Sequence, residues 1–65
     1  MNRKLHGRDY EILAQLAKGV KFSVIAKEFG VTDRTVRRHV MSMCKDIGVN
    51  TPVEAIVWAV RNGLI

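Results

Sequence analysis

The sequence predicts an all-α fold, a four-helix domain that contains a helix-turn-helix. Apolar residues recur at helical spacing in successive segments, glycines fall where those segments stop, and residues 24–40 fit two helices joined by a tight turn. With 65 residues, the chain is expected to be a single small domain over residues 1–65, with residues 1–4 as a flexible basic arm.

The first two helices are predicted from their apolar spacing. The first is expected to open at His6 or Gly7 and to end at Gly19, which acts as a C-cap. Its apolar positions are Ile12, Leu13, Leu16, Ala17 and Val20. The second helix is expected over Lys21 to Phe29. Its inward positions are Phe22, Ile25, Ala26 and Phe29.

The turn between the second and third helices has a steric signature. Two helices that meet steeply need a small residue at the crossing, a residue tolerant of positive φ in the turn, and an apolar residue in the angle between them. Ala26, Gly30 and Val36 are placed for these three tasks. Thr32 is the expected N-cap, and Asp33 suits the first turn because the helix dipole favours an acid there.

The third helix, from about Asp33 to about Ile47, is predicted to have two different faces. At about 100° per residue, its apolar side chains cover an arc of about 60°, and a largely cationic set covers about 100° on the opposite side. The apolar arc holds Val36, Val40, Met43 and Ile47. The outer arc holds Arg34, Arg37, Arg38, Met41 and Lys45.

A cationic face can simply be solvated, as it is on many exposed helices. Here three arginines fall within five residues, and Asp33 is the only nearby acid before Asp46, which differs from a mixed-sign solubilising surface. Following the turn, this face predicts a helix in the major groove of double-stranded DNA.

Arginine suits base reading because its planar fork can donate two hydrogen bonds to guanine or grip a phosphate. Arg37 and Arg38, near the middle of the outer arc, are the expected base readers, and Arg34 can do either. Lys45 lies two turns farther along and is expected to contact phosphate. From its position alone, Met41 contacts a thymine methyl group or stays unused.

The fourth helix, after Gly48 and the Thr51-Pro52 start signal, is expected to run to about Asn62. It is apolar almost all round, although a terminal helix of a small domain buries only one face. Either Trp58 folds back onto the core, or the fourth helices of two chains pair and place two recognition helices roughly 34 Å apart. The predicted homodimer contact comprises Ala55, Trp58, Ala59 and Asn62.

Composition restricts the function classes. Eleven Lys and Arg against six Asp and Glu give a net charge of +5, which favours an anionic partner. The longest apolar run is too short to span a bilayer, so no membrane partner and a cytoplasmic location, nucleoid-associated when bound, are expected. The lone Cys44 is expected to be a buried hydrophobe. We expect no metal, cofactor, small-molecule ligand or catalytic residue, and therefore no enzyme.

Several motifs fall in order along the chain. They are Leu5-x-x-Arg8-Asp9-x-Glu11-Ile12-Leu13, Leu16-Ala17-x-Gly19, Ile25-Ala26, Thr35-Val36-Arg37-x-His39, Ile47-Gly48-Val49 and Glu54-Ala55-Ile56-x-x-Ala59-x-x-x-Gly63-Leu64-Ile65. With these motifs, the chain resembles the LuxR/GerE-type DNA-binding domain from Leu5 to Ile65. The resemblance implies a bacterial or bacteriophage transcription regulator, with the third helix in the major groove and the fourth commonly in a dimer contact.

The resemblance also implies residue roles. Arg37 and Arg38 match base-facing positions, Met41 matches another DNA-reading position, and Thr35 matches a position near the phosphates. With Arg34, these complete the expected base-reading set. The expected phosphate set comprises Thr32, Thr35, Lys45, Arg3 and Lys4.

The chain departs from the family pattern at a few positions. His6 replaces a usual Ser or Thr, Ser42 and Asp46 stand where Asn and Lys are common, and residues 21–24 replace a polar helix start. An exposed Val24 would mark a protein-partner surface. Two functions therefore stay open: a homodimeric DNA-binding regulator, or an interaction protein that pairs with a larger LuxR-type regulator or RNA polymerase.

Overall fold

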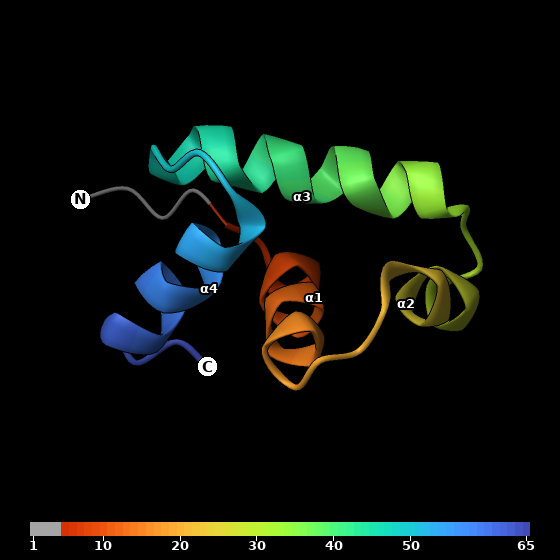
Figure 1. Cartoon of the computed structure of the whole chain (residues 1–65), viewed down its shortest axis with the longest axis horizontal. Helices are drawn as coiled ribbons and strands as arrows, with labels where there is room; N and C mark the ends of the chain where they lie inside the picture. The colour runs from red at the N-terminus through yellow and green to blue at the C-terminus, as the bar shows by residue number, and fades with distance from the viewer. Residues whose placement is uncertain (1–4) are drawn as a thin grey trace.

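The computed structural model describes residues 5–65, which form four α-helices in a bundle (Figure 1). The helices are α1 (Gly7–Ala17), α2 (Phe22–Phe29), α3 (Asp33–Ile47) and α4 (Pro52–Arg61). The predicted all-α class is confirmed. The bounds of α3 match the prediction, whereas α2 starts one residue later than predicted because Lys21 is its extended N-cap. The predicted basic arm, with Arg3 and Lys4, lies outside the described residues.

The longest helix, α3, lies across the other three helices and contacts each of them (Figure 1). Beneath it, α1 is in the middle, with α2 on one side and α4 on the other. Every helix contributes buried apolar side chains to the core. Together with Leu5, which precedes α1, they are Ile12, Leu13, Ile25, Ala26, Val36, Val40, Met43, Cys44, Ala55 and Ala59. Ala17, predicted among the apolar positions of the first helix, is exposed at its end.

The turn between α2 and α3 forms as the sequence predicts. Gly30 ends α2 with φ of 69°, a left-handed conformation that glycine adopts without steric cost. The Val31 N–H donates to the Ala26 carbonyl at 2.9 Å, which closes the turn. Thr32 then begins α3, where its hydroxyl accepts from the Thr35 N–H at 3.2 Å. Both helix ends are therefore satisfied locally, and the crossing is fixed over three residues.

The start of α4 is fixed by a reciprocal pair of hydrogen bonds. The Glu54 N–H donates to the Thr51 hydroxyl at 3.2 Å, and the Thr51 N–H donates to Glu54 Oε1 at 3.1 Å. Pro52 occupies the first helical position, where no N–H is needed. The same face of α4 then carries Ala55 and Ala59, which are fully buried. Their small side chains let α4 pack closely against the core.

Candidate nucleic-acid interface

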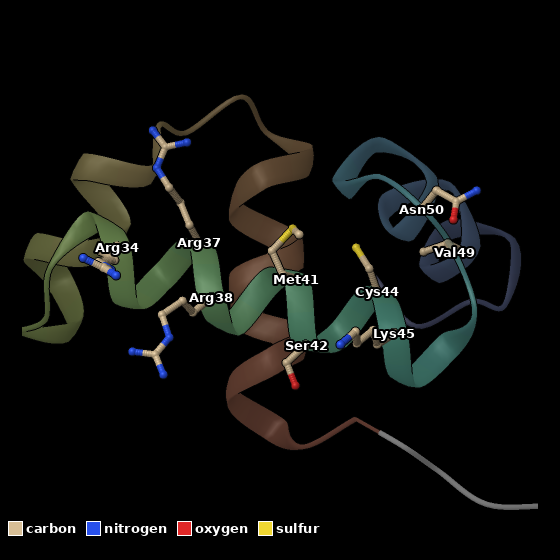
Figure 2. Close-up of a pocket in the computed structure, with 9 residues that line it drawn as sticks. All are labelled: Arg34, Arg37, Arg38, Met41, Ser42, Cys44, Lys45, Val49 and Asn50. Atoms are coloured by element: carbon tan, nitrogen blue, oxygen red, sulfur yellow. The ribbon is translucent and has the colours of Figure 1, made fainter.

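The outer face of α3 is exposed along its whole length because the opposite face is anchored in the core. Val36, Val40 and Met43 are each at most 2% exposed. All the predicted outer residues, by contrast, are exposed: Arg34, Arg37, Arg38, Met41 and Lys45. Figure 2 shows these side chains standing along the surface of a single helix. A continuous cationic strip with one apolar member, Met41, thus faces away from the molecule.

The three guanidinium groups fan out across this strip. Figure 2 shows Arg37 extending to one side of α3 and Arg38 to the other, with Arg34 nearer the start of the helix. Within residues 5–65, none of the three is paired with a carboxylate. Their hydrogen-bond donors are therefore available to an anionic partner. Arg37 and Arg38 therefore lie toward the two edges of the strip and not at its middle, where the sequence prediction placed them, because their positions on the helix are about 100° apart.

Arg37 has an aromatic neighbour. Its Cζ atom lies 5.0 Å from the centroid of the Phe22 ring, at the start of α2. Phe22 is half-buried against the core, as the sequence prediction placed it, but its contact with Arg37 was not predicted. A separation of 5.0 Å is within the range of a cation–π contact.

The two threonines of the predicted phosphate set lie at the start of the same strip. The Thr32 hydroxyl caps the helix and also donates to the Thr35 hydroxyl at 3.1 Å. Both side chains are exposed. In this arrangement Thr32 uses its only hydroxyl proton internally, whereas the proton of Thr35 is free to point outward. Thr35 is therefore the better placed of the two to donate to a phosphate.

A shallow groove follows the strip from Arg34 onward and ends between α3 and the segment leading into α4 (Figure 2). Met41, Cys44 and Lys45 line it from α3, and Val49 and Asn50 line it from the opposite side. Cys44 is buried, as predicted.

The Cys44 thiol, which lines this groove, has a raised pKa. Burial raises its pKa above the ordinary value, and the charge of Glu54 adds to the shift. The thiol is therefore neutral at physiological pH and packs as a small apolar group.

One contact ties α3 to α1 and was missed at the sequence level. The carboxylate of Asp9 is buried, and its Oδ2 accepts from the His6 N–H at 3.0 Å. Its Oδ1 makes no well-aligned hydrogen bond but lies 3.3 Å from His39 Nε2 on α3. The family motifs include both residues, yet a spacing of thirty positions gives no signal that they meet.

The predicted dimer contact needs correction at two residues. Ala55 and Ala59 are fully buried within the chain, so neither can touch a second copy of the folded domain. Trp58 is half-buried against the core, and the Asn62 side-chain amide donates to the Trp58 carbonyl at 2.7 Å. The exposed apolar residues of α4 are instead Val53, Val57 and Val60, at 67%, 43% and 55% exposure.

These three valines form a row, since spacings of four and three residues place side chains on one helical face. The sequence did not single them out, because α4 is apolar on almost all sides. In an apolar helix with alanines four residues apart, the alanines allow close packing inward, so the bulkier valines on the other side remain outside. The outer row of α4 is the part of the helix available to a partner.

Two features are absent from residues 5–65, a cluster of metal-ligating side chains and a membrane-spanning helix. No three His, Cys, Asp or Glu side chains of this range are grouped so that they could hold a metal ion. No helix in the range is both long and apolar enough to cross a lipid bilayer.

Two helices joined by a glycine turn, with the second helix exposing a cationic strip, define a helix-turn-helix domain. The family model described as bacterial regulatory proteins, luxR family, matches residues 3–59. The chain therefore belongs to the luxR family of bacterial regulatory proteins.

Individual relatives are transcription regulators. The chain is 32% identical over 62 residues to the transcriptional regulatory protein YdfI of Bacillus subtilis, covering 95% of this chain and 29% of that protein. It is 36% identical over 55 residues to the nitrate/nitrite response regulator protein NarL of Escherichia coli, covering 85% and 26%. It is 36% identical over 64 residues to the transcriptional activator protein AnoR of Acinetobacter nosocomialis, covering 98% and 27%. The chain thus spans less than a third of the length of these relatives.

Proposed function

We propose that this chain is a sequence-specific DNA-binding transcription regulator that inserts α3 into the major groove. The observation that carries the proposal is the exposed strip of Arg34, Arg37, Arg38 and Lys45 on a helix whose other face is locked in the core. Unpaired guanidinium groups on a rigid helix can meet both guanine edges and phosphates. Membership of a family of regulatory proteins supports the same function.

Within this proposal, the residues divide by position. The exposed outer-face residues Arg34, Arg37, Arg38 and Met41 are assigned to base edges. Thr35 and Lys45, at the two ends of the strip, are assigned to phosphates, because a straight helix leaves the groove toward its ends.

We further infer that two chains pair through the outer row of α4. Full burial of a valine is worth about 1.5 kcal/mol, and Val53, Val57 and Val60 are each about half exposed, so six of them supply about 5 kcal/mol. Association costs at least about 4 kcal/mol in lost freedom. The dimer is therefore weak in free solution and forms on DNA, where two adjacent half-sites raise the effective concentration.

A binding experiment tests the DNA function. Selection from random duplexes first yields a preferred site, and mobility shifts are then measured on this site and on random DNA at two salt concentrations. We expect retention that weakens with salt, and a loss of about 1–3 kcal/mol for Arg38→Ala on the preferred site. Lys18→Ala, which removes one charge at the far end of α1, is the control. Absence of any salt-dependent retention at micromolar protein contradicts the proposal.

A second experiment tests the pairing. Val57→Lys should abolish cooperative binding to a duplex with two half-sites while leaving binding to a single half-site unchanged. Val24→Lys, which changes a similarly exposed valine on α2, is the matched control. Equal cooperativity in all three proteins would rule out α4 as the contact.

The valine row also supports a second candidate function, in which the chain pairs with a larger regulator of the same family or with RNA polymerase. A protein that fails the salt-dependent retention test but loses a partner upon Val57→Lys would fit this candidate.

A further inference from the structure

The contact between Arg37 and Phe22 constrains one member of the cationic strip before any ligand is present. The Arg37 Cζ atom is 5.0 Å from the Phe22 ring centroid, and the two residues come from different helices. Phe22 cannot move freely, because its ring is half-buried against the core at the first position of α2. The ring therefore offers a fixed platform for a side chain that is otherwise exposed.

The contact between Arg37 and Phe22 lies in a hollow that also contains charged side chains. Asp33, one turn earlier on α3, lines the same hollow as Phe22 and Arg37, and so does Lys21. A carboxylate on this side attracts the guanidinium, and the lysine opposes it. Figure 2 shows Arg37 directed to one edge of α3, away from Arg38.

A guanidinium that stacks on a ring does so through its flat face. Its N–H donors lie in the plane of the group and remain available along the edge. Stacking thus restricts the many rotamers of an arginine while leaving its recognition chemistry intact. This is the arrangement expected of a pre-organised reading group, for which less ordering cost is incurred on binding.

We propose that Phe22 is a positioning residue that holds Arg37 ready to read one base. The inference rests on the proposed DNA-binding function and deepens it. Arg37 has to be ordered only on DNA that carries the base to which it donates hydrogen bonds. Pre-positioning by Phe22 therefore lowers the entropic cost of binding only on such DNA. Phe22 therefore contributes to discrimination at that base and not to general attraction for DNA.

The chain supplies a matched control at the other end of α2. Arg8 stacks over Phe29 with its Cζ atom 5.3 Å from the ring centroid, and Phe29 is likewise half-buried against the core. Arg8 belongs to α1 and lies outside the strip on α3. Phe22→Leu and Phe29→Leu therefore remove the same kind of stack from the same helix, and only the first should affect DNA recognition.

The test measures affinity for the selected site and for the same site with the Arg37-dependent base changed. Phe22→Leu should weaken binding to the selected site about two- to fivefold, the range of an exposed cation–π contact, and should reduce discrimination by the same factor. In an Arg37→Ala background, Phe22→Leu should have no further effect. Phe22→Tyr, which keeps the aromatic face, should bind with the affinity and discrimination of the unaltered protein.

Two binding outcomes would overturn the proposal. The first is that Phe22→Leu binds as well as or better than the unaltered protein, which means that Arg37 must leave the ring to reach DNA. The second is that Phe22→Leu weakens binding equally with and without Arg37, which means that Phe22 acts by another route. If the unaltered protein does not bind DNA, or Arg37→Ala has no effect, the failure belongs to the proposed function instead.

A measurement on the free protein separates positioning from general stability. The side-chain protons of Arg37 should show ring-current shifts and restricted motion by NMR, and both should be lost in Phe22→Leu. Phe29→Leu should leave the Arg37 signals unchanged. A freely mobile Arg37 in the unaltered protein contradicts the proposal, whatever the thermal stability of the variants.

Discussion

Asp9→Ala is expected to loosen the attachment of α3 to α1. The substitution removes the carboxylate that accepts from the His6 N–H at 3.0 Å and that lies 3.3 Å from His39 Nε2. Loss of a helix cap costs about 1 kcal/mol. The His39 side chain is 44% exposed, so the loss of its contact with Asp9 adds only about 0.5 kcal/mol.

The total of about 1.5 kcal/mol should lower the melting temperature by about 6–12 °C in a domain of this size. Thermal and urea unfolding followed by circular dichroism at 222 nm measure both quantities. Asp46→Ala, which removes an exposed carboxylate from α3, is the control and should change stability by less than about 0.5 kcal/mol.

A double-mutant cycle with His39→Ala isolates the contact between the helices. If Asp9 and His39 interact, the double variant should be less destabilised than the sum of the single variants by about 0.5 kcal/mol. Stabilisation by Asp9→Ala would refute the reasoning, because it would mean that burying the charge costs more than its partners return. Strict additivity would show that the 3.3 Å approach carries no energy.

Other expected outcomes concern the turn, the thiol and the strip. Gly48→Ala should destabilise the domain by about 1–2 kcal/mol in urea unfolding, because Gly48 has φ of 79°, whereas Gly7→Ala should be neutral or stabilising by up to about 1 kcal/mol. Since folding raises the pKa of Cys44, stability should fall as pH rises through the alkaline range, and Cys44→Ala should remove that dependence; an unchanged profile in Cys44→Ala contradicts it. Lys45→Ala should weaken binding on all sequences and reduce the salt slope by about 1, in contrast to a base-specific loss for Arg38→Ala.

The helices and their faces could be predicted because local rules decide them. Val36 and Val40 share one face of α3 by helical periodicity alone, and both are buried. Gly30 ends α2 because glycine adopts the left-handed backbone conformation, and Thr32 begins α3 because its hydroxyl caps the helix. No knowledge of the tertiary arrangement is needed at these positions.

Contacts between helices could not be predicted in the same way. The wheel of α4 shows that it is apolar all round but does not say which side docks, and packing selects Ala55 and Ala59 over the bulkier valines. The meeting of Asp9 with His39 depends on how α1 and α3 cross, and so does not follow from either helix alone. The roles of the strip residues depend further on a DNA molecule and remain predictions.

The two unpredicted contacts act on the same property of α3, its rotation about its own axis. His39 follows Arg37 by two residues and therefore projects about 200° around the helix from it. His39 contacts Asp9 on α1, and Arg37 contacts Phe22 on α2. These two contacts lie on different sides of α3 and restrict its rotation in addition to the buried valines. Rotation by a single residue position, about 100°, would break both contacts and would also turn a different set of side chains outward. The pairs that stabilise the domain thus also help to fix which residues α3 turns outward.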